Sequence, residues 1–185
     1  PGSMTGTNTV LPRDAPPPAP RPDPPSPRVE VEQALAGDLA AGRLELTEDR
    51  RGLVLAVPEA FSFETGRDDL SAEAAQLMAR VAAVLKTLPN PVRVEGHTDN
   101  TPIRTARFTS NWDLSTARAT RVVAFFISEA GLAPTRLSAA GYSEYHPRAG
   151  NDTPEGRARN RRVDIVILNQ ATAVSEEPAP GVALP

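Results

Sequence analysis

Apolar residues recur at helical spacing in three stretches of the chain. Across residues 70–88 they follow one another at three- and four-residue steps with polar side chains between them, and Ser71 can cap the start. Residues 110–131 repeat the pattern, beginning at a serine and ending at a glycine. A looser version over residues 29–42 predicts one short introductory helix.

Alternation of apolar and polar residues predicts strands elsewhere. Leucines alternate with charged residues within residues 43–49, and an apolar run at 53–57 follows a turn that ends at Gly52, which indicates a hairpin. Three more strands are expected over residues 92–97, 134–142 and 161–168. The long polar stretch 143–160 is interpreted as a loop.

The order of these elements is strand–strand–helix–strand–helix–strand–strand after the introductory helix. Helices that alternate with strands in this way pack economically on one face of a sheet whose strands run in mixed directions. The sequence therefore predicts an α+β fold, a two-layer sandwich with its helices on one face of a mixed β-sheet.

Composition distinguishes the two ends of the chain from its body. Ten of the 20 prolines lie within the first 27 residues, where few large apolar side chains occur. Residues 1–28 are interpreted as an expression remnant followed by a Pro-rich disordered linker, and residues 170–185 as a disordered tail. The folded domain, with its N-terminal helix, is expected over residues 29–169.

The sequence offers few residues for catalytic or metal chemistry. It has no cysteine, which excludes disulfides and zinc–thiolate sites, and its two histidines, His97 and His146, fall short of the ligands of a zinc hydrolase. No serine has the glycine neighbours of a nucleophile elbow. We therefore expect no enzyme, no metal and no cofactor, and interpret His97 as a strand-end residue that satisfies local hydrogen bonds.

Charge and aromatic content argue against nucleic acid as a partner. The net charge is −3, with one tryptophan, two tyrosines and five phenylalanines, whereas nucleic-acid binding requires a dense basic stripe with aromatic platforms. The arginine-rich stretch 156–162 is interpreted as a solvated rim with internal ion pairs. Trp112 is expected to anchor the start of its helix in the core, the alternative being that it stacks on a sugar.

One pair of charged residues suggests binding instead. Asp99 lies just beyond the carboxyl end of the predicted strand 92–97, and Arg118 lies about two turns into the following helix. A carboxylate pairs with an ammonium group and a guanidinium binds a carboxylate, so the two side chains together could hold a zwitterion. The alternative is that Asp99 and Arg118 pair with each other or with neighbours.

Several short motifs in a fixed order carry a resemblance. The stretches "VEGHTDNTPI", "SNWDLSTARA", "GY" and "EGRARNRRVDIVIL" resemble the OmpA-like peptidoglycan-binding domain, and the likeness covers residues 53–168. Within that family, "NTPI" and "SNWDLS" are most similar to the periplasmic part of MotB-type flagellar motor stator proteins. The Pro-rich stretch ahead of the domain fits this branch.

The resemblance implies a ligand and a set of residues that bind it. The family binds the stem peptide of peptidoglycan without covalent chemistry, chiefly through the amino-acid end of diaminopimelate. The family's aspartate and arginine correspond to Asp99 and Arg118, the two residues that the zwitterion argument identifies. Further pocket positions correspond to Thr98, Asn111, Leu114, Thr65, Gly66 and Arg162, the last of which could instead brace the fold. Arg104 or Arg107 is expected at the pocket rim.

The resemblance also implies a cellular context. Members of this branch are periplasmic homodimers, anchored in the inner membrane by an N-terminal helix beside an ion-channel partner subunit. The expected function is to anchor a flagellar motor stator to the cell wall, with the predicted helix 29–42 at the dimer interface or controlling it. Two alternatives stay open, namely an outer-membrane OmpA- or Pal-type cell-wall tether and a cell-wall hydrolase.

Overall fold

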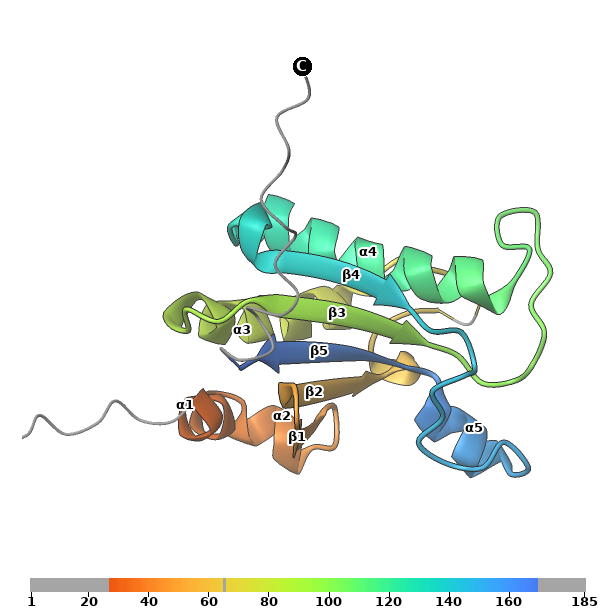
Figure 1. Ribbon diagram of the computed structural model, residues 1–185, viewed down its shortest axis with the longest axis horizontal. Helices are drawn as coiled ribbons and strands as arrows, with labels where there is room; N and C mark the ends of the chain where they lie inside the picture. Colours follow the sequence, from red (N-terminus) through yellow and green to blue (C-terminus); the bar gives the residue numbers. More distant parts are fainter. Residues whose placement is uncertain (1–26, 65, 170–185) are drawn as a thin grey trace, which may run out of the picture.

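A computed structural model describes residues 27–64 and 66–169 (Figure 1). In this part of the chain one sheet contains β1 (Glu45–Asp49), β2 (Gly52–Pro58), β3 (Val92–His97), β4 (Leu137–Gly141) and β5 (Arg162–Leu168), in the order β1-β2-β5-β3-β4. Neighbouring strands are antiparallel except β3 and β4, which are parallel. Two short 3-10 turns, η1 (Glu59–Phe61) and η2 (Pro134–Arg136), follow β2 and precede β4.

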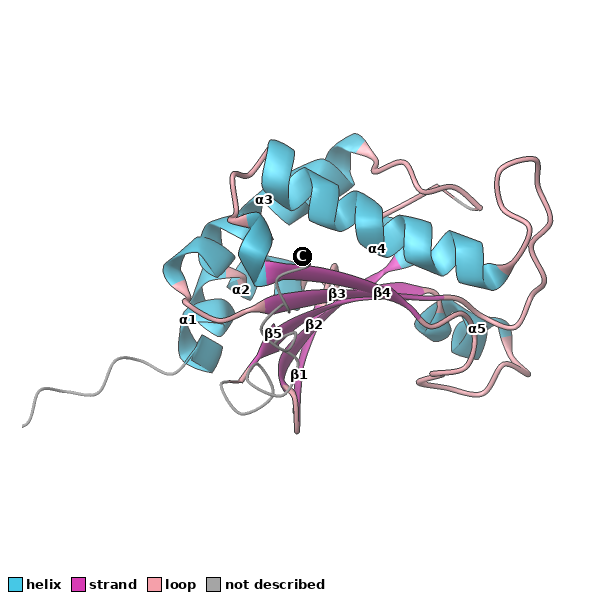
Figure 2. Ribbon diagram, turned by 45° about the horizontal axis from the view of Figure 1, so that its top comes forward, coloured by secondary structure: helices cyan, strands magenta, loops and turns pink. Residues whose placement is uncertain are grey.

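The long helices α3 (Ala72–Thr87) and α4 (Asn111–Ser128) cover one face of this sheet (Figure 2). Each begins after a serine whose hydroxyl accepts a backbone hydrogen bond three residues on, Ser71 for α3 and Ser110 for α4. The core between the two layers includes Leu55, Val94 and Ile165 from the sheet and Leu77, Val81, Val122 and Phe126 from the helices. The predicted α+β two-layer sandwich is confirmed.

The introductory helix is broken in two, where the sequence predicts one helix. α1 (Pro27–Ala34) and α2 (Ala36–Ala40) meet at Leu35, whose backbone leaves the helical conformation with φ −110° and ψ 14°. Beyond the break, Asp38 is buried and accepts hydrogen bonds of 2.8 Å from Arg80 on α3. We attribute the break to this ion pair, in which Asp38 is buried and Arg80 is exposed, and which a periodicity of apolar residues cannot reveal.

The predicted polar loop 143–160 contains a further helix, α5 (Pro154–Asn160). Thr153 caps it by accepting a hydrogen bond of 3.1 Å from the Gly156 N–H, and Pro154 occupies the first turn, where its missing N–H is not needed. The loop prediction was wrong because so short and arginine-rich a helix has no apolar stripe. The threonine followed by proline was the available signal.

The predicted linker and tail lie largely outside the described residues. Residues 1–26 of the predicted linker and all of the predicted tail are not described, and Thr65 is not described either. The last two residues of the predicted linker, Pro27 and Arg28, belong to α1. Between residues 27 and 169, with residue 65 left aside, no helix combines the length and apolarity needed to cross a bilayer.

Two glycines let α4 lie directly against the sheet. A Cβ atom on Gly96 would lie 2.0 Å from the carbonyl oxygen of Ser115, and one on Gly141 would lie 2.6 Å from the backbone nitrogen of Thr116. Such distances are far below ordinary contact, so the helix touches β3 and β4 main chain to main chain. The first turns of α4 are thereby held beside the end of β3, where Asp99 follows.

Replacing Gly96 by alanine is expected to lower the free energy of unfolding by about 1–3 kcal/mol, because α4 must move away from β3. Gly37→Ala is the matched control, since a Cβ at Gly37 in α2 meets nothing within 4 Å and alanine favours a helix by up to about 1 kcal/mol. Chemical denaturation of both variants measures the difference. Equal stability of the two variants would contradict a constraint at this contact.

Candidate functional site

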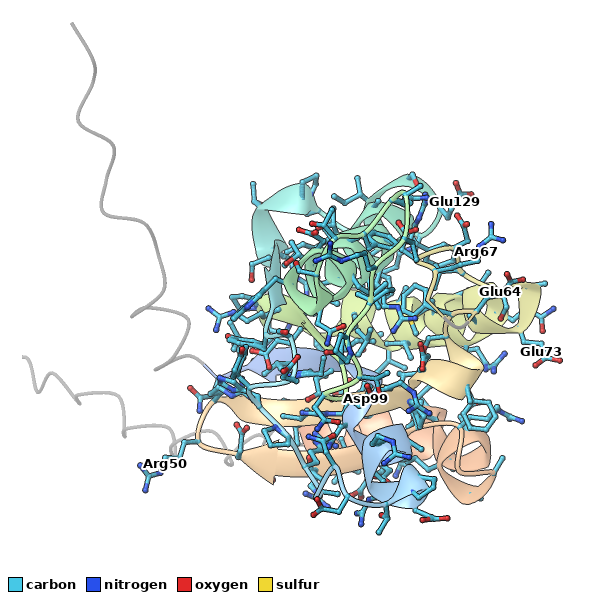
Figure 3. All side chains as sticks on the ribbon, turned by 90° about the vertical axis from the view of Figure 1, so that its right-hand side faces the viewer. Arg50, Glu64, Arg67, Glu73, Asp99 and Glu129 are labelled. Carbon is cyan, nitrogen blue, oxygen red and sulfur yellow. The ribbon has the colours of Figure 1, made fainter. Side chains whose placement is uncertain are left out.

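The end of the sheet at which β3 stops gathers residues from several segments, with Asp99 near the centre (Figure 3). These residues line a cavity of about 410 Å³, which we call the cleft. Its lining residues are Glu59 after β2, Thr98, Asp99, Thr101, Pro102 and Ile103 after β3, Asn111, Leu114 and Arg118 on α4, Arg161 before β5, and Gly66. Three regions far apart in the sequence, residues 59–66, 98–118 and 161, therefore build one site.

Most of the predicted site residues meet in this cleft. Those that line it are Thr98, Asp99, Asn111, Leu114, Arg118 and Gly66. Thr65 lies outside the described residues. Arg162 does not belong to the described lining of the cleft and instead lines a separate cavity near β1 and β2.

Of the two neighbouring arginines in the motif "NRRV", Arg161 lines the cleft and Arg162 does not. Adjacent residues of an extended segment point to opposite sides, so Arg161 reaches the cleft while Arg162 bonds Asp164 at 3.1 Å on the sheet face away from α4. The motif "NRRV" contains two neighbouring arginines, and only the strand register distinguishes them. Arg161 and Glu59 are the charged residues of the cleft that the sequence reasoning missed.

Four charged side chains form one series of ion pairs in the cleft. Arg118 pairs with Glu59, and Glu59 accepts a second hydrogen bond of 2.6 Å from Nε of Arg161. Nη1 of Arg161 donates to Asp99, also at 2.6 Å. Asp99 and Arg118 thus pair with neighbours, the alternative that the sequence left open. Among the described lining residues, two acids and two arginines balance in charge.

Arg118 is built into the wall of the cleft. Its side chain is 2% exposed, its Nε donates to the carbonyl oxygen of Arg67 at 2.8 Å, and its guanidinium lies 5.0 Å from the ring centre of Phe63. The side chain of Arg161 is 34% exposed by comparison. A ligand that enters the cleft therefore meets Arg161 first and Arg118 behind it.

Asp99 is held as a carboxylate. Its Oδ2 accepts from Arg161, and its Oδ1 accepts from the Thr101 N–H at 2.8 Å. Burial alone raises the pKa of Asp99, but the hydrogen bonds from Arg161 and Thr101 outweigh burial and bring that pKa below its usual range. Asn111 fixes the backbone here by donating to the carbonyl oxygens of Asp99 and Thr101 at 3.3 and 3.0 Å.

Thr98 contributes an unused hydrogen-bonding group to the cleft. Its backbone N–H donates to Ser143 at 2.9 Å, but its buried hydroxyl has no hydrogen-bond partner in the described part of the chain. An unsatisfied buried polar group costs about 1–3 kcal/mol, which a polar ligand in the cleft could offset.

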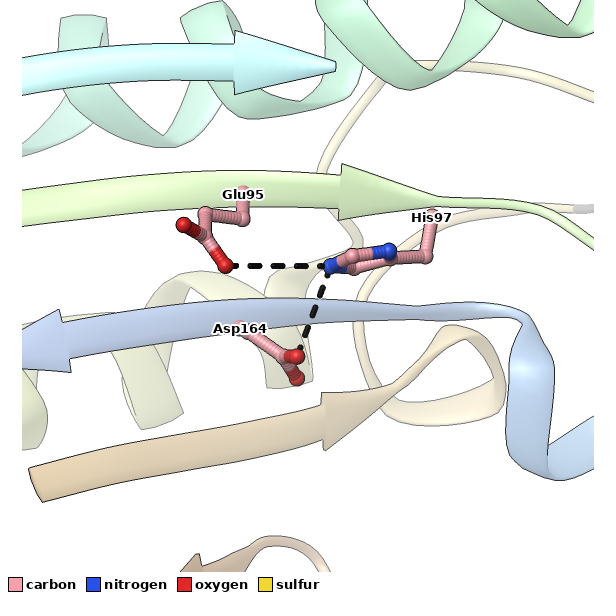
Figure 4. A group of neighbouring side chains, drawn as sticks. All are labelled: Glu95, His97 and Asp164. Atoms are coloured by element: carbon pink, nitrogen blue, oxygen red, sulfur yellow. Dashed lines mark ion pairs between the residues drawn. The ribbon is translucent and has the colours of Figure 1, made fainter. Parts of the chain in front are cut away.

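His97 lies on the face of the sheet away from the helices, beside Glu95 and Asp164 (Figure 4). Its Nε2 is 3.4 Å from Asp164 and 4.0 Å from Glu95, and the three side chains are close enough to hold a metal ion. The expectation that His97 satisfies local hydrogen bonds was wrong, because neither ring nitrogen has a hydrogen-bond partner among the described residues.

Arginines compete with any cation for this group. Arg51 donates to both oxygens of Glu95 at 2.6 and 2.8 Å, and Arg162 donates to both oxygens of Asp164 at 3.2 and 3.1 Å. Burial, followed by the charge of Arg162, lowers the pKa of His97 to about 2, so the ring is neutral. We interpret the group as a buried ion-pair network that joins β3 to β5.

Trp112 lies at the surface, not in the core as predicted. It is 49% exposed and stacks on Tyr145 with 5.5 Å between ring centres. The prediction was wrong because the buried side of α4 passes through Asn111 and Leu114, which turns position 112 outward. Phe108, 4% exposed, supplies the buried aromatic residue ahead of the helix.

Comparisons with known proteins agree with this fold. The model of the OmpA family matches residues 62–161. The chain is 34% identical over 149 residues to motility protein B of Bacillus subtilis, a match that covers 80% of this chain and 57% of that protein.

Solved structures that are similar to this one include the following two. The cell wall anchor of the T6SS from Pseudomonas aeruginosa has a TM-score of 0.71 and 36% identity, over 76% of this chain and 97% of that one. The periplasmic domain of Helicobacter pylori MotB has a TM-score of 0.65 and 32% identity, over 72% of this chain and 86% of that one. The likeness to MotB periplasmic domains is therefore confirmed.

The family match includes the central residues of the cleft, since Asp99 and Arg118 both lie within residues 62–161. The chain spans about half the length of the curated relatives it matches, 52% and 57% of two of them. The OmpA family is a family of binding domains and not of enzymes. This chain therefore belongs to the OmpA family and carries its peptidoglycan-binding domain.

Proposed function

We propose that the cleft holds the zwitterionic end of a peptidoglycan stem peptide, the amino-acid end of its diaminopimelate residue. The observation that carries this proposal is the charge balance of Glu59, Asp99, Arg118 and Arg161. A ligand with one ammonium and one carboxylate has no net charge and therefore keeps this balance. Its ammonium pairs with Asp99, and its carboxylate pairs with Arg161 and Arg118. A purely cationic or anionic ligand leaves a buried charge without compensation.

The size and walls of the cleft fit this ligand. A volume of about 410 Å³ lies within the range of small-molecule sites, and Ile103 and Leu114 offer apolar contact for an aliphatic side chain. The unpartnered hydroxyl of Thr98 offers one further hydrogen bond. No covalent step is required, since binding alone connects the domain to the wall.

The cellular role that we propose is to anchor a flagellar motor stator to the cell wall from the periplasm. Its support is the sequence likeness to motility protein B and the structural likeness to the MotB periplasmic domain. In this proposal a membrane segment and an ion-channel partner subunit hold the other end of the anchor. An outer-membrane tether of the OmpA or Pal type is the alternative that uses the same binding chemistry.

The proposed homodimer would strengthen a weak interaction, because two linked sites bind one polymer with a high effective concentration. The helix 29–42 predicted at the interface corresponds to α1 and α2. There, Val31 and Leu35 are 0% and 1% exposed and pack in the domain's own core, whereas Val29 is 40% exposed. Light scattering of the protein, with Val29→Asp as the variant, measures whether this surface joins two copies.

Co-sedimentation with intact sacculi tests the binding function. We expect the protein to pellet with sacculi, to be displaced by free diaminopimelate, and to release no soluble muropeptides. Release of muropeptides would instead support the hydrolase alternative.

Deleting the gene in the source organism separates the two anchor roles. Loss of a stator anchor should leave assembled flagella that do not rotate, whereas loss of an outer-membrane tether should leave swimming intact.

A further inference from the structure

Two further cavities lie near the cleft, and each shares lining residues with the next. Gly66 lines both the cleft and a second cavity of about 330 Å³. Asp68, Arg107 and Phe108 line both this second cavity and a third of about 750 Å³. We call the third cavity the outer groove; it runs along the exposed side of α4 from Trp112. A series of adjacent cavities suits a ligand that extends beyond a single amino acid.

Trp112 gives the outer groove a flat apolar surface. Tyr145 stacks on the indole with an angle of 24° between the rings, and the two side chains are 49% and 65% exposed. Aromatic pairs of this kind bury large areas in protein cores and interfaces, so a pair left in water indicates a surface that contacts something else.

Asp68 lines the same groove and carries a buried carboxylate oxygen that no described residue bonds. The residue is 4% exposed, and its Oδ2 accepts from Arg107 at 2.6 Å. Its Oδ1 is buried without a hydrogen-bond partner in the described part of the chain. Because an unsatisfied buried acceptor is costly, this oxygen points to a ligand that donates a hydrogen bond.

The outer groove favours a polar ligand without net charge. Its charged lining residues in the described chain are Asp68, Asp113, Arg107 and Arg121, which balance. Threonines of α4, Thr116 and Thr120, add hydroxyl groups to the wall.

We infer that the outer groove is a carbohydrate subsite for one sugar ring of the glycan strand. This inference rests on the proposed function, because the glycan is covalently joined to the stem peptide in the cleft. The C–H groups on the face of a pyranose ring pack against an indole, and its hydroxyl and acetamide groups donate hydrogen bonds. Trp112 provides the first kind of contact, and Asp68 the second.

Fluorescence and calorimetry test the subsite, because Trp112 is the only tryptophan of the chain and reports on this groove alone. The probes are the stem peptide, the same peptide carrying its N-acetylglucosamine–N-acetylmuramic acid disaccharide, and the disaccharide alone. The wild-type protein should bind the disaccharide–peptide about tenfold more tightly than the peptide, which corresponds to about 1.4 kcal/mol. The disaccharide alone should change the tryptophan fluorescence.

Trp112→Ala should remove the tenfold gain while the affinity for the stem peptide stays at the wild-type value. Ile127→Ala is the matched control, since Ile127 is an exposed apolar residue (37%) on the same helix, and it should keep the gain. Asp99→Asn should lose the stem peptide but retain the fluorescence response to the disaccharide.

The two proposals fail in different ways. If the stem peptide binds and Trp112→Ala keeps the tenfold gain, the carbohydrate subsite is wrong and the proposed function stands. If the disaccharide binds and the stem peptide does not, the proposed function is wrong and the groove still binds sugar. If neither probe binds the wild-type protein, both proposals are wrong.

Discussion

Asp99→Asn is expected to abolish retention of the protein on intact sacculi. The substitution keeps the shape of the side chain but removes the charge that pairs with a ligand ammonium, and it leaves Arg161 and Arg118 facing Glu59 alone. Charge-assisted hydrogen bonds contribute about 1.5–3 kcal/mol each, so the affinity should fall by about 100-fold. Sedimentation at a fixed sacculus concentration measures the loss.

Asp152→Asn is the matched control for this substitution. Asp152 is an exposed acid ahead of α5 and does not belong to the described lining of the cleft, so its variant should sediment like the wild-type protein. Equal retention of the two variants would contradict the zwitterion proposal.

The low pKa of Asp99 adds an expectation for pH. A carboxylate whose pKa is lowered in the folded state is ionised throughout the range above its unfolded value of about 3.9. Retention of the wild-type protein should therefore hold from pH 7 to pH 5 and fall only below about pH 4. The same group stabilises the fold above that unfolded value and loses this contribution as the pH falls through its folded pKa. Loss of retention near pH 6 would point to another titrating group.

Arg118→Ala is expected to destabilise the protein as well as to weaken binding. The variant leaves the buried Glu59 with Arg161 as its remaining partner and removes the hydrogen bond to the Arg67 carbonyl. Removing one partner of a buried ion pair typically costs about 3–5 kcal/mol, and urea denaturation should show a loss of that order. The sequence alone presents Arg118 as a ligand-binding group, whereas the structure gives it a second role in holding η1 and α4 together.

Arg121→Ala, one turn further along α4, is the control for stability. Arg121 and its partner Asp69 are 43% and 45% exposed and 3.2 Å apart, so its removal should cost about 0–1 kcal/mol. The double variant Arg118→Met with Glu59→Gln should regain part of the stability, because it leaves no buried charge unpaired at that pair. If Arg118→Ala and Arg121→Ala are equally stable, the buried ion pair does not stabilise the fold.

The long helices could be predicted because each buries one side, and one-sided burial leaves a period in the sequence. β2 is buried on both sides over most of its length and could be predicted from its apolar run instead. α5 and the break at Leu35 left no such period, since polar contacts produce them. Thr153 caps α5 through its hydroxyl, and Asp38 binds Arg80 beyond the break. Elements stabilised mainly by polar contacts are therefore the ones that hydrophobic patterning misses.

The cleft was predictable only in part, for a related reason. Asp99 and Arg118 stand in recognisable motifs, but Glu59 and Arg161 are 102 residues apart in the chain. Pairing of β2 with β5 brings them together, and the Glu59 N–H donates to the Arg161 carbonyl at 2.9 Å just beyond the ladder. Strand register, which no local motif contains, determines which arginine enters the site.

The position of β3 within the sheet has a mechanical consequence for an anchor. β3 pairs with β5 from Val92 to His97 and with β4 from Val92 to Gly96, and the cleft follows its carboxyl end. α1 lies at the opposite end of the sheet (Figure 1), so in the proposed anchor role tension between a ligand in the cleft and the chain at α1 would run along the strands. Backbone hydrogen bonds between strands lie across that direction, so a pull loads many of them in shear at once. In that proposed role the domain would resist the pull, because these hydrogen bonds would have to break together and not one after another.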